Sequence, residues 1–185
     1  GIENRLPYVS NLNIFPNMAT TDSLLSCSAM GEDPDLDQLN LLYSWEVLGA
    51  GLVAHVGASW PLTPKDVEPG DVIQCTATAF DPHGGFAHLG GTMLVENRDP
   101  VVDVISISPV SGVTNNGSLT CFVQATDPDL HAMSIDYEWS NFTTGQPLGS
   151  GTALNLDPSL GIVGDIIRCD AVIHDAHGGV VTASA

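Results

Sequence analysis

The sequence predicts an all-β chain built from two tandem β-sandwich domains. Three observations lead to this prediction: one unit of sequence occurs twice, apolar residues alternate at every second position, and no long segment has the apolar period of a helix. The two copies lie about 94 residues apart, which is the length of one small domain. We therefore expect a first repeat at residues 1–96 and a second repeat at residues 97–185.

The two copies agree at positions where a fold or a binding site would require particular residues. In chain order, the matching segments are Leu25–Cys27 with Leu119–Cys121, Asp33–Asp35 with Asp127–Asp129, Tyr43–Trp45 with Tyr137–Trp139, Gly70–Cys75 with Gly164–Cys169, and Asp81–Gly85 with Asp175–Gly179. Because the copies share aspartates, glycines, cysteines and aromatic residues, we expect them to share one fold.

The two ends of the chain resemble the boundary between the copies. Ile2–Arg5 corresponds to Val95–Arg98, and Ala185 corresponds to about position 91 of the first copy. We therefore expect residues 1–3 to be the tail of a preceding repeat. We also expect the second repeat to have a truncated last strand.

Alternation with a period of two places apolar residues on one side of several segments in each copy. In repeat 1 these residues are Leu25, Cys27, Ala29, Leu39, Leu41, Tyr43, Trp45, Ile73, Cys75, Ala77 and Ala79. Repeat 2 alternates in the same way, and clusters of Gly, Pro, Asn and Asp separate the segments. The pattern is typical of half-buried strands, so we expect very little helix.

The order of cysteine, tryptophan and cysteine in each copy is typical of an immunoglobulin-like sandwich. In that fold a strand B cysteine bridges the two sheets to a strand F cysteine, and a strand C aromatic residue packs against the bridge. Cys27, Trp45 and Cys75 follow this order in repeat 1. We expect Trp45 and its counterpart Trp139 to be core residues rather than carbohydrate-stacking platforms, because they alternate with leucines expected to be buried.

The cysteines also indicate a cellular compartment. None of the four lies in a CxxC pair, and each copy holds two at the same separation: Cys27 with Cys75, and Cys121 with Cys169. Distant pairs repeated in each domain predict one intradomain disulfide per repeat, the alternative being four reduced core cysteines. Disulfides persist in oxidising compartments, so we expect an extracellular or cell-surface protein, with the periplasm as a further option.

The charge balance excludes some classes of partner. The chain has 22 acidic residues against 4 lysines and arginines, for a formal net charge of −18. This charge repels nucleic acid and anionic lipid, so we expect no nucleic-acid partner and no direct insertion into a membrane. The acids predict either a strongly solvated surface or a set of ligands for hard divalent cations.

Two groups of motifs carry a resemblance to a known class of repeat. They are the segment from Ala125–Asp129 to Tyr137–Trp139, and the segment from Asp81–Gly85 to Val95–Pro100. Together they resemble the cadherin-like and PKD-like repeats of large bacterial surface proteins. The resemblance implies that the Asp-x-Asp pair and the acids of the linker bind calcium between successive domains. Three features depart from cadherin repeats: Arg98 lies inside the expected calcium cage, the sequence has no clear counterpart of the cadherin Asp-Arg-Glu motif, and each repeat has a pair of cysteines.

The expected topology brings the acidic residues of each repeat together at one end of its domain. In a sandwich of this kind the start of the first strand and two of the loops lie at one pole. We therefore predict a calcium site at the start of repeat 2, formed by Asn97, Asp99, Asp127, Asp129 and Asp175, and an equivalent group in repeat 1, formed by Asn4, Asp33, Asp35 and Asp81. The alternative is turn chemistry alone, because an aspartate before Pro or Gly hydrogen-bonds its own backbone.

Histidines offer a different metal chemistry in the same loops. His131, His174 and His177 fall at the expected pole of repeat 2, and imidazole with carboxylate suits zinc or copper better than calcium. Catalysis has little support, because the cysteines are assigned to disulfides and no Gly-x-Ser-x-Gly motif is present.

We therefore expect a non-catalytic, extracellular, structural or adhesive repeat module. Its partners would be the adjacent repeats of its own chain, with possible calcium stiffening at the junction. The alternative function is a carbohydrate- or protein-binding module that uses exposed loops, and an enzyme fragment is a third.

Overall fold

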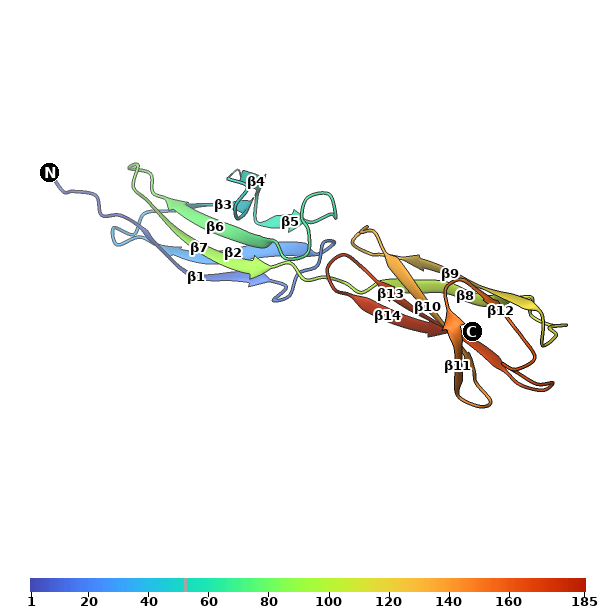
Figure 1. Ribbon diagram of the computed structural model, residues 1–185. Helices are drawn as coiled ribbons and strands as arrows, with labels where there is room; N and C mark the ends of the chain where they lie inside the picture. The colour runs from blue at the N-terminus through green and yellow to red at the C-terminus, as the bar shows by residue number, and fades with distance from the viewer. Residues whose placement is uncertain (52) are drawn as a thin grey trace. The chain divides into compact units, whose positions relative to one another are not determined.

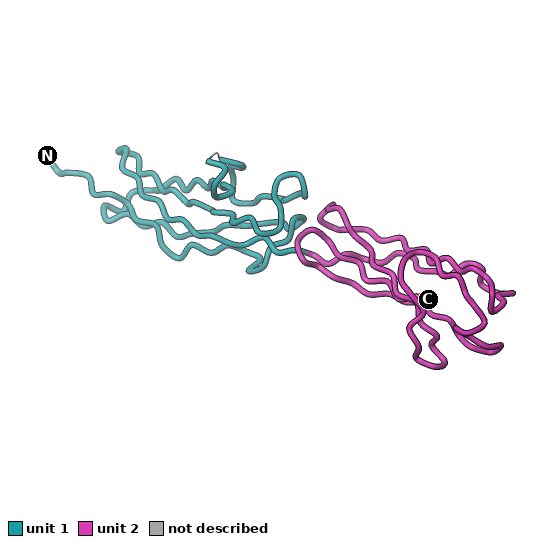
Figure 2. Tube along the Cα trace, in the orientation of Figure 1, with its two compact units in different colours: residues 1–97 teal, residues 98–185 magenta. Residues whose placement is uncertain are grey.

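The computed structural model describes residues 1–51 and 53–185, and within them it contains fourteen strands and no helix (Figure 1). The chain divides into two compact units, residues 1–97 and residues 98–185 (Figure 2). Each unit has one three-stranded and one four-stranded antiparallel sheet. This arrangement confirms the all-β, immunoglobulin-like prediction. Among the described residues no helix is long and apolar enough to cross a membrane.

Unit 1 contains seven strands. They are β1 (Tyr8–Phe15), β2 (Leu24–Glu32), β3 (Asn40–Val47), β4 (Val53–Val56), β5 (Ser59–Pro61), β6 (Val72–Phe80) and β7 (Phe86–Leu94). One sheet has the order β1-β2-β5 and the other has the order β4-β3-β6-β7. After β7, Val95 forms an isolated parallel bridge with Ala19.

Unit 2 repeats the same order of strands. They are β8 (Val101–Ser108), β9 (Ser118–Thr126), β10 (Ser134–Asn141), β11 (Gln146–Ser150), β12 (Ala153–Asn155), β13 (Ile167–His174) and β14 (Val180–Ser184). Its sheets have the orders β12-β9-β8 and β11-β10-β13-β14. The shared topology follows from the shared alternation, because each strand has one face for the core and one for solvent.

A disulfide joins the two sheets within each unit. Cys27 of β2 is bonded to Cys75 of β6, and Cys121 of β9 is bonded to Cys169 of β13. The Cα–Cα distances of 6.5 and 6.4 Å lie within the usual range for disulfides. No free cysteine is present among the described residues. The predicted pairing is therefore confirmed in both copies.

One tryptophan packs in each core beside the disulfide. Trp45 is 0% exposed and Trp139 is 1% exposed. Their indole Nε1–H groups donate to the carbonyls of Gly57 and Gly151, both at 2.8 Å. A buried indole N–H needs such a partner. Both residues are core residues, as the sequence predicts, and neither offers a face to a carbohydrate.

The two cores differ at the end of the domain opposite the loops that hold Asp33–Asp35 and Asp127–Asp129. In unit 1 the core includes Ala19, Val67, Met93 and Val95, all of them buried. The core of unit 2 is built around Leu119, Leu154, Leu156, Trp139 and its two cysteines. Trp60 of unit 1 contacts Trp45 at a ring distance of 6.3 Å, and a leucine holds its place in unit 2.

Candidate functional site

In unit 1 the predicted acidic residues gather around the start of the domain. Arg5 donates its backbone N–H to Asp35 Oδ2 at 2.7 Å and its Nε–H to Asp35 Oδ1 at 2.8 Å. Its Nη2 also donates to the carbonyl of Pro34. Asn4 donates from Nδ2 to Asp81 Oδ2 at 2.9 Å. The segment before β1 is thus tied to the β2–β3 loop and to the β6–β7 loop.

Unit 2 repeats the arginine contact with the same partners. Arg98 donates its backbone N–H to Asp129 Oδ2 at 2.8 Å, and its Nε and Nη2 donate to Asp129 Oδ1 at 3.0 and 2.8 Å. Nη2 also donates to the carbonyl of Pro128 at 2.7 Å. We call the contact of Arg5 with Pro34 and Asp35, and that of Arg98 with Pro128 and Asp129, the arginine clamp.

The two clamps differ most in burial. The side chains of Arg98 and Asp129 are 25% and 0% exposed, whereas those of Arg5 and Asp35 are 62% and 23% exposed. A buried carboxylate without a counter-charge is strongly unfavourable. The guanidinium of Arg98 is therefore a necessary partner of Asp129. The cation that neutralises this aspartate is an arginine of the same domain.

Four further aspartates of the predicted sites act as turn residues. Asp33 Oδ1 accepts from the backbone N–H of Asp35 at 2.7 Å, and Asp127 Oδ1 accepts from that of Asp129 at 2.8 Å. In the second loop, Asp81 Oδ1 accepts from the N–H groups of His83 and Gly85 at 2.7 and 2.8 Å. Asp175 Oδ1 accepts in the same way from His177 and Gly179. These bonds are the turn chemistry that the sequence offered as the alternative to metal binding.

Steric constraints explain why glycines occupy positions 84 and 85, after Asp81. Gly84 has a φ of +91°, which side-chain-bearing residues rarely adopt. A Cβ on Gly85 would collide with Asp81 Oδ2. The glycines therefore let the loop fold back so that one carboxylate can accept two backbone N–H groups.

A leucine with left-handed backbone lies in the same loop of both units. Leu36 has φ of +64° and Leu130 has φ of +67°, although neither is a glycine or an asparagine. Both side chains point into solvent, with 92% and 71% of their surface exposed. A strained and exposed leucine that recurs in both copies has no explanation in the packing of either core.

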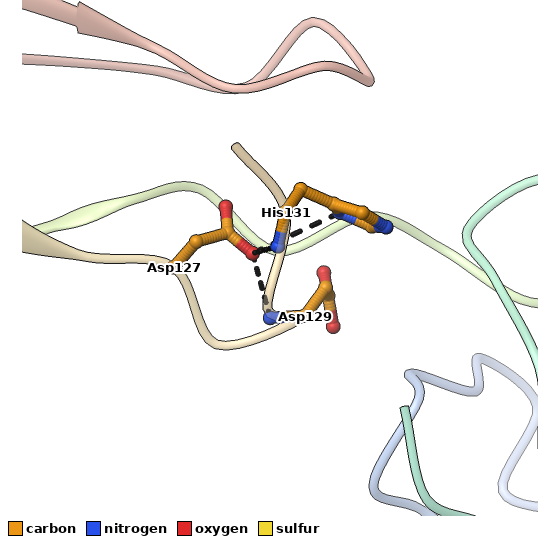
Figure 3. A group of neighbouring side chains, drawn as sticks. All are labelled: Asp127, Asp129 and His131. Carbon is orange, nitrogen blue, oxygen red and sulfur yellow. Dashed lines mark hydrogen bonds and ion pairs between the residues drawn. The ribbon is translucent and has the colours of Figure 1, made fainter. Parts of the chain in front are cut away.

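One carboxylate oxygen in each unit is buried without a protein donor. Asp33 Oδ2 and Asp127 Oδ2 are enclosed and accept no hydrogen bond from residues 1–51 or 53–185. Figure 3 shows that the hydrogen bonds to Asp127 converge on its other oxygen. An enclosed oxygen of this kind is satisfied by a water molecule or by a cation.

Nearby groups in unit 2 offer ligands for such a cation. Asp127, Asp129 and His131 each have one ligand atom within 4.8 Å of the others. His131 Nδ1 lies 3.8 Å from Asp127 Oδ1, and the His131 ring lies 4.3 Å from the ring of His177. Calcium requires six to eight oxygen ligands, whereas zinc accepts a mixture of imidazole and carboxylate. The set therefore fits a zinc-type ion better than calcium.

The predicted metal ligands are thus only partly brought together. Asp127, Asp129 and His131 lie in one loop of unit 2, and the ring contact of His131 with His177 brings the loop of Asp175 beside them. Asp99 is exposed and takes no hydrogen bond or ion pair within the described part of the chain. Asn97 is half-buried and is the last residue of unit 1. His174 instead lies 3.7 Å from Asp136.

The hydrogen bonds at the start of unit 1 favour the ionised form of its aspartates. The backbone N–H of Arg5, followed by its side chain, lowers the pKa of Asp35 below the ordinary value for aspartate. The side-chain amide of Asn4 is the main cause of a lowered pKa at Asp81, assisted by the N–H groups of Gly85 and His83. Both aspartates are therefore charged at neutral pH.

Comparison with known proteins assigns no family to the chain. The chain matches no protein-family model, and no curated protein matches it. The similar solved structures include three N-terminal domains of the bacteriophage RB49 Highly Immunogenic Outer Capsid protein, with 14% identity and a TM-score of 0.41, over 97% of this chain and 68% of that one.

Two further solved structures are similar to the chain. Murine CEACAM1b is 14% identical with a TM-score of 0.33, over 95% of this chain and 96% of that one. An adhesin of an Antarctic bacterium, described as Ca²⁺-stabilised and ice-binding, is 13% identical with a TM-score of 0.35. The match covers 98% of this chain, which spans about half of the adhesin structure, 48% of its length. These similarities are those of immunoglobulin-like and adhesin-type β domains, and no functional argument rests on them.

Proposed function

We propose that this chain is a non-catalytic structural segment of an extracellular repeat protein, in which an arginine clamp ties the start of each domain to a loop of the same domain. The observation that carries the proposal is the recurrence of the clamp: Arg5 binds Asp35 in unit 1, and Arg98 binds Asp129 in unit 2. The two intradomain disulfides support an oxidising compartment.

The clamp suits a mechanical role because of where it acts. Each arginine lies three residues before the first strand of its domain, and it binds a loop 30 or 31 residues further along the chain. A force applied to the segment before the domain must first break this charge-assisted fork. The disulfide then limits how far an unfolded domain can extend, because it encloses 48 residues of sequence separation.

Single-molecule force spectroscopy on the whole chain tests this proposal. Under oxidising conditions each domain should release roughly 45 residues, or about 160 Å, and a reductant should about double that length. Arg98→Gln should lower the unfolding force of unit 2 and leave that of unit 1 unchanged. Lys65→Gln, which removes a positive charge away from the clamps, is the matched control. Equal unfolding forces in wild type and Arg98→Gln would contradict the proposal.

A binding module is the second candidate function, and the exposed leucines favour it. Leu36 and Leu130 hold a strained backbone in the same loop of each unit and face solvent. Such residues cluster at sites that contact a partner. A carbohydrate or protein partner would then contact the β2–β3 and β9–β10 loops.

Binding of glycans and of candidate cell surfaces should be compared for wild type and the Leu36→Asn, Leu130→Asn double variant. A folded double variant that loses binding would favour the binding module. Absence of binding by the wild type, together with a force response that depends on Arg98, would favour the structural segment.

A bound metal ion is a further part of the proposal, and the enclosed Asp33 and Asp127 Oδ2 atoms favour it. The ion would bind beside Asp127 without displacing Arg98 from Asp129. With calcium, the oxygen ligands of the loop would stiffen the start of the domain, at an affinity on the order of 10⁻⁴ to 10⁻³ M. With zinc, His131 and Asp127 would supply the ligands.

Thermal melts separate these possibilities. The chain is melted in excess chelator, in 5 to 10 mM calcium and in dilute zinc, alongside Asp127→Asn and His131→Gln. A rise in melting temperature with calcium that is lost in Asp127→Asn but still seen in His131→Gln would support calcium binding. A rise in melting temperature with zinc that is lost in both variants would support zinc binding. No shift with either ion would leave the arginines as the only cations of these loops.

A further inference from the structure

In unit 1 a carboxylate and an imidazole join the β2–β3 loop to the β6–β7 loop. His83 Nε2 lies 3.5 Å from Asp37 Oδ2, and the two side chains are 62% and 25% exposed. Because an imidazole N–H is attracted to a carboxylate whether or not the ring is protonated, this contact is favourable by itself. The two loops of unit 1 therefore need no bound ion to stay together.

The equivalent pair in unit 2 consists of two imidazoles. By the alignment of the repeats, Asp37 and His83 correspond to His131 and His177. The rings of His131 and His177 lie 4.3 Å apart, so the same two loops of the domain meet at the same place. Neither ring carries negative charge, so the attraction found in unit 1 is absent here. One change of residue type thus leaves two metal-binding side chains next to each other.

Two polar atoms beside this histidine pair are enclosed without a partner. Asp127 Oδ2 and His131 Nδ1 form no hydrogen bond within residues 1–51 and 53–185. The side chain of Asp127 is 1% exposed and that of His131 is 17% exposed. His131 Nδ1 lies 3.8 Å from Asp127 Oδ1, which is too far for a hydrogen bond. Enclosed polar atoms without partners are rare, and each indicates a bound water molecule or ion.

The unpartnered oxygen of Asp127 is also turned away from its own turn. Figure 3 shows the backbone N–H groups of Asp129 and His131 directed at one oxygen of Asp127, while the other oxygen points away from them. The carboxylate of Asp129 is engaged differently, because both of its oxygens accept hydrogen bonds from Arg98. Asp127 is therefore the carboxylate of this loop that has an oxygen to offer to an ion.

We infer that unit 2 binds one divalent cation of the zinc class through Asp127 Oδ2, His131 and His177, and that this ion fastens the β9–β10 loop to the β13–β14 loop. The inference rests on the metal ion of the proposed function and specifies its chemical class, its third ligand and its restriction to unit 2. One carboxylate and two imidazoles with a water molecule make the four ligands that zinc takes. Calcium would need six to eight oxygens.

A water molecule is the competing occupant, because it could bridge Asp127 Oδ2 and His131 Nδ1. The cation is favoured for two reasons. It supplies positive charge to an enclosed carboxylate, which a water molecule does not. It also accounts for the second imidazole, since a bridging water would have no use for His177 in place of the Asp37–His83 contact of unit 1.

The first test is a zinc titration of the untagged chain in competition with a chromophoric chelator. One ion should bind per chain, and the NMR ring signals of His131 and His177 should shift together. His177→Gln and His131→Asp should each weaken binding at least about tenfold, since even changes outside the ligand shell cost that much. His131→Asp recreates the pair of unit 1 and should keep the domain folded. His174→Gln is the matched control and should leave zinc affinity unchanged.

The second test moves the site into unit 1. That unit also has an enclosed, unpartnered carboxylate oxygen, Asp33 Oδ2, and a histidine at the equivalent position, His83. Asp37→His should therefore give the chain a second zinc ion, and the double variant Asp37→His, His83→Gln should lose it again. A folded Asp37→His chain that still binds one ion would contradict the role assigned to this position.

Three results would overturn the inference. They are zinc binding that His177→Gln leaves unchanged, an equal loss of binding in His174→Gln, and no zinc binding by the wild type. A calcium response in the thermal melts without zinc binding would overturn it too, but would keep the metal ion of the proposed function. None of these results bears on the arginine clamp, whose test is the unfolding force of Arg98→Gln measured in excess chelator.

Discussion

Arg98 and Asp129 form a fork in which two side-chain nitrogens of the arginine, at 3.0 and 2.8 Å, share one carboxylate oxygen. The backbone N–H of the same arginine donates to the second oxygen at 2.8 Å. One residue thus supplies three donors to a carboxylate that is 0% exposed. Because the carboxylate is enclosed, removal of the guanidinium leaves a buried charge without its counter-charge.

The first prediction compares the two arginine clamps. Arg98→Gln should destabilise unit 2 by about 3 kcal/mol, since it breaks a buried ion pair from one side. Arg5→Gln should cost less, because the Arg5 side chain is 62% exposed and water screens its charge. Urea unfolding followed by NMR reports on each unit separately. Asp129→Asn in the Arg98→Gln background should recover part of the loss, and equal losses for the two single variants would contradict this account.

The second prediction concerns the disulfides. Replacing both Cys121 and Cys169 with alanine should destabilise unit 2 by about 4 kcal/mol in the chain-entropy model, because the unfolded chain loses its cross-link. Unit 1 should keep its stability, since tandem domains are only weakly coupled. The Cys27→Ala, Cys75→Ala variant is the matched control and should show the reverse pattern. Simultaneous unfolding of both units in either variant would refute their independence.

The third prediction concerns acid. The folded-state pKa values of Asp35 and Asp81 are lowered, so their contribution to stability is complete above the unfolded value of about 3.9. It is lost as the pH falls below that value and through the folded pKa. The urea midpoint of unit 1 should therefore decrease below about pH 4. In Asp81→Asn this decrease should be shallower, and an unchanged slope would show that the bond from Asn4 does not stabilise the ionised form.

The fourth prediction concerns the left-handed leucines. Leu130→Asn should stabilise unit 2 by about 1 kcal/mol, because asparagine adopts positive φ with less strain than leucine. Leu36→Asn should have the same effect on unit 1. Leu48→Asn, an exposed leucine at the end of β3 without this backbone conformation, serves as the control and should gain nothing. A loss of stability in Leu130→Asn would mean that the leucine side chain makes a stabilising contact.

The fold could be predicted because its determinants lie close together in the sequence. The alternation of Ile73, Cys75 and Ala77 specifies a half-buried strand without reference to the rest of the chain. The order of Cys27, Trp45 and Cys75 then fixes which strands face one another. Duplication strengthened both inferences, because a pattern that occurs by chance would not recur at the same spacing.

The candidate site could be predicted only in part, because it depends on long-range contacts of flexible side chains. From the sequence we expect Arg98 to lie among the acidic residues of the linker, where its positive charge would oppose calcium binding. Only the structure shows that it reaches Asp129, 31 residues away, as the counter-charge. The contact of the His131 and His177 rings joins two loops in the same way. Calcium binding by these loops stays a prediction.

The cross-sheet disulfides have a consequence for a protein exposed to extracellular proteases. A cut in any loop between Cys27 and Cys75, or between Cys121 and Cys169, leaves both fragments joined through sulfur. The strands on either side of the cut also remain in their sheets, where the buried tryptophan and the backbone ladders hold them. A nicked domain would therefore continue to transmit tension along the chain, and the damage would become visible only when a reductant separates the pieces.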